Sequence, residues 1–333
     1  MENLFRIGYI LKEVEQTTLM LIVSLIASFI ATLITIPWLI KKMSHAGMVG
    51  KDMNKIDKPE IPEMGGIAVL IGFLIGFFAL IVLKFFKLTP VMMAALFTMI
   101  GCAFVGMMDD IFGLRQRVKG ILPMIFALPL AVYVRGTFIY VPFIGNIDLG
   151  LFSRIILVFA ITCAANGMNM LEGFNGLGTG LGIIMCITLI VTSFIQGKTD
   201  ALFLLFPLLG ALLAFLCFNM YPAKIFPGDT MMLFTGAVIA SAAIIGMLKW
   251  ICFILLIPMV AEFFLKLKGR FNAECFGTPD EKGYLRYNGR TESLTHIVMK
   301  RWRLKEWEVV GILWGVEAVI GGMAVIVMML DIM

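Results

Sequence analysis

Charged side chains are scarce in this sequence. Asp, Glu, Lys and Arg make up 15% of the 333 residues, whereas 60% are hydrophobic and the mean hydropathy is +0.98. Soluble domains average about 25% charged and roughly 45–50% apolar residues. The shortage of charge excludes an ordinary soluble domain and indicates a protein integral to the cell membrane.

Patterns for zinc sites and disulfide frameworks are also missing. The chain has two histidines, and its six cysteines show no CxxC spacing. Most of these cysteines lie in or beside apolar runs, where Cys acts as a small hydrophobic residue. The first sixteen residues mix acidic and basic side chains and contain no short cleavable apolar stretch, so we expect no signal peptide.

The sequence contains instead a series of long apolar runs. A helix needs about 20 residues to cross roughly 30 Å of hydrocarbon, because lipid offers no partner to an unpaired peptide group. We predict an all-α fold, a polytopic bundle of about ten transmembrane helices that forms one integral membrane domain over residues 1–333. The expected spans are 17–40, 66–83, 91–108, 121–134, 154–165, 177–195, 201–218, 231–247, 250–265 and 309–330, of which the fourth and fifth are short.

The positions of Lys and Arg predict the orientation in the membrane. Nineteen of the 27 lie in five alternate loops, at 41–63, 109–120, 166–176, 219–230 and 266–308. Cytosolic loops carry such an excess. We therefore expect these loops in the cytosol, with 266–308 as an extended loop between the last two spans, and both termini outside. Topology alone accounts for the net charge of +5, so we expect no nucleic-acid partner.

The second cytosolic loop begins with two adjacent carboxylates, Asp109 and Asp110, at the end of an apolar run. Neighbouring carboxylates repel each other, so at least one of them requires a cation or a raised pKa, and the candidate cations are Arg115, Arg117 and Lys119. This arrangement suits Mg²⁺-assisted phosphate chemistry. The alternative is an ordinary acidic helix cap that faces water.

The third cytosolic loop carries a polar series with steps of three: Asn166, Asn169, Glu172 and Asn175. This spacing predicts a stripe along a helix end, and amide and carboxylate oxygens suit Mg²⁺ or the polar edges of a sugar or base. Glycines at 173, 176, 178 and 180 allow either close approach of a ligand or close helix packing.

Two further segments lie on the same side of the membrane. Asp229 follows a turn and begins an apolar run, so it is either a helix cap or a metal ligand opposite Asn169, with Phe226 offering an aromatic face to a base. In the last loop, Lys266, Lys268 and Arg270 either bind phosphates or only set the topology.

Intramembrane charge helps to choose between classes of function. Ion-coupled transporters place charged groups at mid-depth. Here the expected spans contain only Glu317 and the near-terminal Arg154 and Glu262. This favours an enzyme, with a transporter or flippase for an anionic or lipid-linked metabolite as the alternative. A scaffold subunit would have no reason to gather these polar residues on one face.

Four segments together resemble one enzyme family: GKDMNKIDKPEIPEMGG (50–66), MMDDIFGLR (107–115), NGMNMLEGFNGL (166–177) and FNMYPAKIFPGDT (218–230). The family is the polyprenyl-phosphate N-acetylhexosamine-1-phosphate transferase superfamily, glycosyltransferase family 4, and the chain is most similar to its dolichyl-phosphate UDP-GlcNAc phosphotransferase branch. The resemblance implies transfer of a hexosamine-1-phosphate, most simply GlcNAc-1-phosphate, from a UDP-sugar to a polyprenyl or dolichyl phosphate. It also implies that UMP is released and that Mg²⁺ is the cofactor, for which Mn²⁺ can substitute.

The resemblance also implies roles for individual residues. It gives one of Asp109 and Asp110 as base or nucleophile, Lys119 as a phosphate contact, and Asn169 and Asp229 as Mg²⁺ ligands. It places Phe226 on the uracil, Asn175 and the backbone near Met53 on the uridine, Glu63 on the nucleoside side, and Arg270, with Lys266 and Lys268 nearby, by the sugar and pyrophosphate.

The chain departs from the bacterial members of this family at several positions. Those members carry a third acid, a DG(L/I)DG-like motif and a GDxGS motif, whereas this chain has Gly113, Glu172 with Asn175, and Thr230 with Met231 in those places, and a histidine-rich segment is missing. These differences favour the archaeal and eukaryotic branch, and the compact final loop favours an archaeal source. The sequence does not identify the hexosamine or the length of the lipid. It also leaves open whether the acceptor attacks directly or through a covalent intermediate, and whether the protein forms a homodimer.

Overall fold

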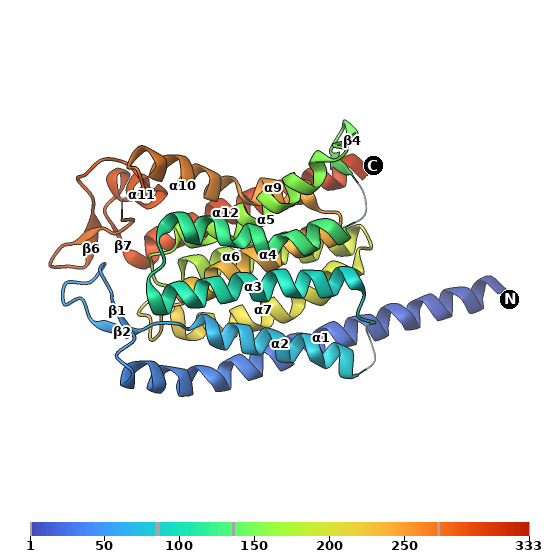
Figure 1. The fold of residues 1–333 in the computed structure, drawn as a ribbon, viewed down its shortest axis with the longest axis horizontal. Helices are drawn as coiled ribbons and strands as arrows, with labels where there is room; N and C mark the ends of the chain where they lie inside the picture. Colours follow the sequence, from blue (N-terminus) through green and yellow to red (C-terminus); the bar gives the residue numbers. More distant parts are fainter. Residues whose placement is uncertain (1, 84–86, 135–136, 272–273, 333) are drawn as a thin grey trace.

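The fold is a bundle of long helices with short strands at its two ends (Figure 1). The structure is a computed structural model that describes residues 2–83, 87–134, 137–271 and 274–332. The helices are α1 (Glu2–His45), α2 (Gly66–Val82), α3 (Pro90–Phe112), α4 (Gln116–Tyr133), α5 (Phe152–Leu171), α6 (Leu177–Ile195), α7 (Thr199–Asn219), α8 (Gly228–Ile245), α9 (Lys249–Leu255), α10 (Ile257–Lys268), α11 (Leu294–Arg301) and α12 (Glu306–Ile332).

Three small antiparallel sheets complete the described chain. They pair β1 (Val49–Lys51) with β2 (Glu60–Pro62), and β3 (Phe138–Val141) with β4 (Gly145–Asp148). The third sheet has the order β5 (Thr278–Pro279), β6 (Tyr284–Arg286), β7 (Leu304–Lys305).

The prediction of an all-α membrane bundle is confirmed, but the number of ten spans is not. Seven described helices are long and apolar enough to cross a membrane, or eight if α9 and α10, which are bent by 49°, form one span. Helix α2 has only 17 residues, and α4 is not among the helices that satisfy both criteria. Helix α5 is longer than expected: it continues through Asn166, whose side-chain amide donates to Thr162 O at 3.0 Å, and ends at Leu171.

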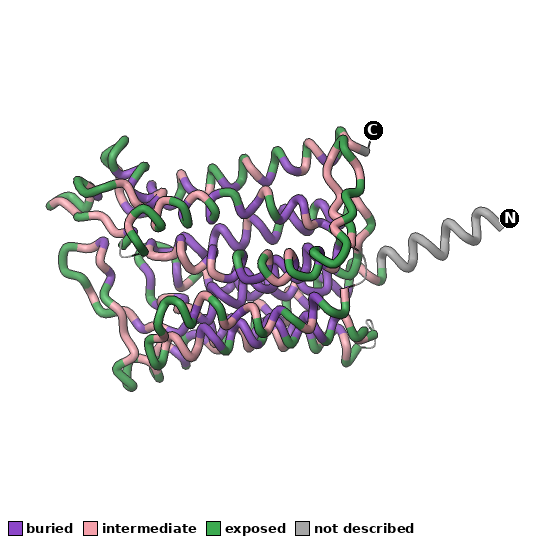
Figure 2. The backbone as a smooth tube through the Cα atoms, turned by 45° about the horizontal axis from the view of Figure 1, so that its top comes forward, coloured by how far each residue is buried: buried purple, intermediate pink, exposed green. Residues whose placement is uncertain are grey.

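Helix α8 forms the centre of the bundle. Every residue from Thr230 to Ile244 is buried, and Figure 2 shows the buried backbone concentrated in the inner helices. Glycines let neighbouring helices approach α8 closely: a Cβ on Gly106 of α3 would lie 2.4 Å from Asp229 O, and one on Gly236 would lie 2.3 Å from Ala164 O of α5. The polar ends of α3, α5 and α8 therefore lie close together.

Local signals in the sequence fix the ends of α3. Thr89 accepts a hydrogen bond from Met92 N at 3.3 Å, and Pro90 occupies the first turn, where a missing N–H costs nothing. Gly113 ends the helix with a φ of +62°, which a side chain would disfavour. The adjacent carboxylates Asp109 and Asp110 thus lie in the last turn of α3.

The polar loops gather at one end of the bundle. The β1–β2 pair, the β5–β6–β7 sheet and α11 lie there, whereas the β3–β4 hairpin and both chain termini lie at the opposite end (Figure 1). The polar loops and the two ends of the described chain therefore lie at opposite ends of the bundle.

Candidate active site

Four polar side chains from four helices converge at the loop end of the bundle. Lys119 Nζ, in the first turn of α4, lies 2.6 Å from Asp109 Oδ2 and also pairs with Asp229 Oδ2. The amide of Asn169 is assigned with its nitrogen toward Asp229, because only this orientation satisfies both neighbours; it then donates to Asp229 Oδ1 at 2.8 Å and accepts from Lys119 Nζ at 2.6 Å. We call these four residues the Lys119 cluster. The predicted proximity of Asp109, Asn169 and Asp229 is confirmed.

The Lys119 cluster brings several ionisable groups together in a confined place. Two carboxylates share one ammonium, and the Lys119 side chain is only 8% exposed. Oxygen atoms of Asp109, Asn169 and Asp229 all converge on the position of that ammonium, and such oxygens are the ligands that Mg²⁺ prefers. Among the described residues, no group of three or more His, Cys, Asp or Glu could hold a metal. A Mg²⁺ site here would therefore depend on the amide of Asn169 and on oxygens from water or substrate.

Asp110 has a different environment from its neighbour Asp109. Its Oδ1 accepts from Asp229 N at 2.7 Å, and its Oδ2 accepts from Thr230 N at 3.0 Å and Thr230 Oγ1 at 2.6 Å. These are donors at the N-terminus of α8, which have no partner within the helix. Asp110 thus caps α8 from α3, and it holds the backbone that carries Asp229. The alternative of Asp229 as the cap of α8 is wrong.

Most of the predicted site residues line one cavity of about 1290 Å³, which we call the main cavity. The predicted residues in its wall are Met53, Glu63, Lys119, Asn169, Asn175, Phe226, Asp229, Lys266 and Arg270. Lys268 is exposed and is not part of this wall. Asp109 and Asp110 are not part of it either, but they contact Lys119 and the start of α8, respectively.

Backbone hydrogen bonds join the first and fourth polar loops. Phe226 N donates to Pro62 O at 2.8 Å, and Gly65 N donates to Phe226 O at 2.9 Å. This places Phe226 and Glu63 in the same wall of the main cavity. Burial, and secondarily the carboxylate of Asp110, raises the pKa of Glu63. A Cβ on Gly50 would lie 2.0 Å from Glu63 Oε1, so the glycine leaves room for this carboxylate.

The predicted stripe in the third loop is correct for two of its four residues. Asn166 and Asn169 lie on α5, but the helix ends at Leu171 and Glu172 is already extended. The chain then turns through glycines with φ of +151° and +81° at 173 and 176, which only glycine adopts readily. Burial raises the pKa of Glu172 to about 7, and its Oε2 accepts from Gly178 N at 2.7 Å.

A buried polar network behind Asn175 was not predicted. Asn175 Nδ2 donates to Asp52 Oδ2 at 3.0 Å, and Asn175 N donates to Glu306 Oε1 at 2.8 Å. Lys55 pairs with Asp52 and lies 3.6 Å from Glu306 Oε2. The polar run at 51–55 was the sequence feature that could have indicated this network, but its charges are equally typical of a loop that sets the membrane topology. The network ties the first loop and α12 to the third loop.

The main cavity extends from the Lys119 cluster into an apolar part, which we call the apolar arm. Its walls are Phe159 and Cys163 of α5 and Met259, Val260 and Phe263 of α10. Helix α10 is bent away from α9 by 49°, and the proline in its first turn has no N–H to continue the helical bonding. Phe159, Val260 and Phe263 are exposed side chains, so the arm is not sealed inside the bundle.

Comparison with known proteins places this site in a family. The family model for glycosyl transferase family 4 matches residues 92–247, which contain all four residues of the Lys119 cluster. The chain is 44% identical to a protein of Saccharolobus solfataricus provisionally named UDP-N-acetylglucosamine–dolichyl-phosphate N-acetylglucosaminephosphotransferase, over 92% of this chain and 97% of the relative. It is 29% identical to the enzyme of that name from Dictyostelium discoideum, over 71% and 69% of the two chains. It is also 32% identical to a phospho-N-acetylmuramoyl-pentapeptide-transferase of Borreliella burgdorferi, over 71% and 76%. The chain therefore belongs to glycosyl transferase family 4.

Proposed function

We propose that this protein transfers N-acetylglucosamine-1-phosphate from UDP-GlcNAc to a polyprenyl or dolichyl phosphate and releases UMP. This would be the first membrane step of lipid-linked glycan assembly. The names of the archaeal and Dictyostelium relatives support this substrate pair. The structural observation that carries the proposal is that one cavity joins the charged Lys119 cluster to the apolar arm. Such a cavity suits a reaction between a soluble anionic donor and a lipid.

The polar part of the main cavity suits the UDP-sugar. Phe226 is half-buried in the wall and offers a ring to the uracil, while Glu63 and Asn175 bring polar groups to the same region. Arg270 and Lys266 lie in the wall as cations for the pyrophosphate. Lys266 Nζ also donates to Met170 O at the end of α5, which directs it toward the site.

The Lys119 cluster suits the phosphate chemistry. Asn169 and Asp229 would hold a Mg²⁺ ion, which when bound would offset the negative charge of the two phosphate substrates. Lys119 would neutralise charge on the phosphoryl oxygens. Asp109 would accept the proton of the acceptor phosphate, whose second pKa near 6 makes this an easy transfer. The acceptor oxygen then bonds to the β-phosphorus, the bond to the bridging oxygen breaks, and UMP leaves. Asp110 is less suited to this role because α8 occupies both of its oxygens.

The proposal includes an orientation. The excess of Lys and Arg at the loop end of the bundle supports a cytosolic active site with both termini outside. The alternative of a transporter gains little support. Among the described residues, the fully buried carboxylates within candidate spans are Glu317 of α12 and Glu262 of α10, and Glu262 accepts hydrogen bonds from Ser293 Oγ and Leu294 N.

The proposed reaction predicts UMP release by the purified protein. With Mg²⁺, a panel of UDP-sugars and a polyprenyl phosphate in detergent, we expect UMP to form fastest with UDP-GlcNAc and to require the lipid phosphate. UMP formed in equal amount to the enzyme without acceptor would indicate a covalent aspartyl intermediate instead of direct attack. No UMP with any donor, together with counterflow across vesicles, would favour the transporter.

The apolar arm makes a separate prediction through two exposed cysteines. Cys163 lines the arm, whereas Cys217 is exposed on α7 and does not line the main cavity. We expect a polyprenyl phosphate to slow alkylation of Cys163 by N-ethylmaleimide severalfold and to leave Cys217 unchanged, as followed by mass spectrometry. Equal protection of both cysteines, or no protection of Cys163, would show that the acceptor's tail does not occupy the apolar arm.

A further inference from the structure

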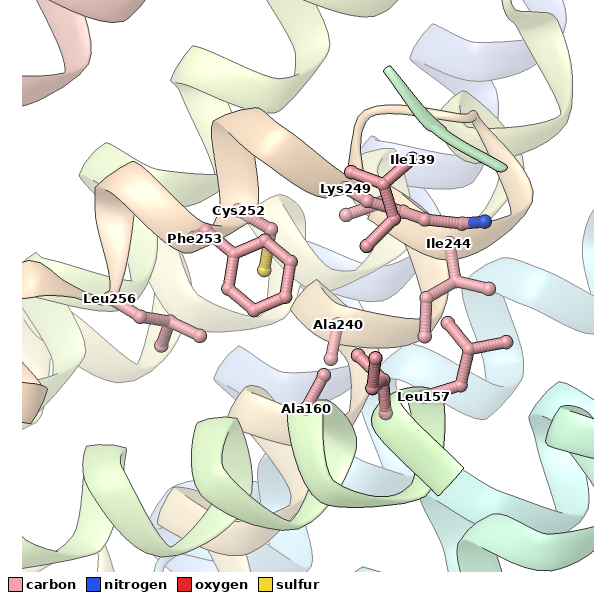
Figure 3. A pocket seen from close by; sticks show the side chains of 11 residues that line it. Ile139, Leu157, Ala160, Ala240, Ile244, Lys249, Cys252, Phe253 and Leu256 are labelled. Carbon is pink, nitrogen blue, oxygen red and sulfur yellow. The ribbon is translucent and has the colours of Figure 1, made fainter. Parts of the chain in front are cut away.

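A second, smaller cavity lies in the half of the bundle remote from the Lys119 cluster. Leu157 and Ala160 of α5 face Ala240 of α8, and Cys252 and Phe253 of α9 form the adjoining wall (Figure 3). We call this cavity the notch. Its volume of about 20 Å³ accommodates one methyl-sized group.

The wall of the notch is apolar. Of the lining residues only Lys249 is charged, and its ammonium donates to Phe138 O at 3.0 Å. A water molecule in the notch would lack the two to four polar partners that it normally needs. The notch therefore suits a hydrocarbon group.

The notch and the apolar arm lie on one path. Leu256, at the bend between α9 and α10, lines both cavities. On α5, Phe159 lines the arm and the next residue, Ala160, lines the notch. From Asn169 in the Lys119 cluster to Leu157 in the notch, α5 rises roughly 18 Å at about 1.5 Å per residue. A long lipid tail whose phosphate lies at the cluster can therefore reach the notch through the arm.

We infer that the notch is a binding subsite for a methyl branch in the distal part of the acceptor's isoprenoid tail. The inference rests on the proposed function. A tail that moves from bilayer to protein exchanges one apolar environment for another, so apolarity alone gives no selectivity. A recess of methyl size selects by close contact instead, because a branch that fills it gains dispersion contacts that an unbranched chain does not. The strand residue Ile139 lines the notch too, so the β3–β4 hairpin borders the path toward the far end of the bundle.

Filling the notch tests this inference. We expect Ala160→Phe to raise the KM for a long polyprenyl phosphate about three- to tenfold, as for the loss of the dispersion contacts of one methyl branch. The KM for geranyl phosphate, whose tail is too short to reach the notch, and the KM for the UDP-sugar should stay unchanged. Phe253→Ala, which opens the wall at a partly exposed side chain, should also reduce the preference for the long acceptor.

The matched control is Ile155→Phe, which adds the same ring to α5 at an exposed position outside the notch. It should change neither KM. An equal rise of KM for both acceptors in Ala160→Phe, or no rise for either, would overturn the inference. So would an equal rise for an unbranched alkyl phosphate of similar length. Failure of the proposed function itself would look different: the unmodified protein would release no UMP with any acceptor.

Discussion

Asp229→Ala is expected to reduce Mg²⁺-dependent transfer by at least about 100-fold while the protein remains folded. Asp229 contacts both Lys119 and Asn169. Its removal leaves, within the Lys119 cluster, only Asp109 to neutralise Lys119 and only Asp109 and the Asn169 amide to bind a metal ion. The rate of UMP release against Mg²⁺ concentration measures the effect, and thermal stability in detergent reports on folding.

The matched control for Asp229→Ala is Asp280→Ala. This carboxylate also forms an ion pair, with Arg303, but it lies in the last polar loop and does not line the main cavity. Its removal should leave the rate within about twofold of normal, since an exposed ion pair contributes little and this one lies outside the main cavity. Full activity in Asp229→Ala would exclude the metal assignment.

Asp110→Ala is expected to lower the thermal midpoint by about 5–10 °C, in addition to a loss of activity. The substitution leaves three donors at the start of α8 without their acceptor. Such a loss costs about 3 kcal/mol when the acceptor is charged. Because α8 then no longer holds Asp229 in place, a higher Mg²⁺ concentration should be needed for half-maximal rate.

Asp109→Asn provides the comparison for Asp110→Ala. Lys119 keeps its contacts with Asp229 and Asn169 in this variant, so the thermal midpoint should change little. The rate should nevertheless fall strongly if Asp109 accepts the acceptor's proton. Unchanged stability in Asp110→Ala would contradict the capping role, and an active Asp109→Asn would contradict the assignment of the base.

The sequence by itself determined the class of this protein and the identity of most site residues. Apolar runs of about 20 residues dictate membrane helices, because unpaired peptide groups are too costly in lipid. Their alternation with loops then places every second loop on the same side. Asp109, Lys119, Asn169 and Asp229 could be predicted as neighbours because each lies at a helix end on that side.

Only the tertiary structure decided what each of these residues contacts. Asp109 and Asp110 are the same residue type at adjacent positions, but a helix turns by about 100° per residue, so one faces Lys119 and the other faces α8. The end of α5 at Leu171 depends on glycine conformations in the following loop. The apolar arm and the notch depend on the bend at Leu256 and on small side chains that meet from separate helices. Contacts of this kind arise from packing between distant segments, and no local pattern in the sequence specifies them.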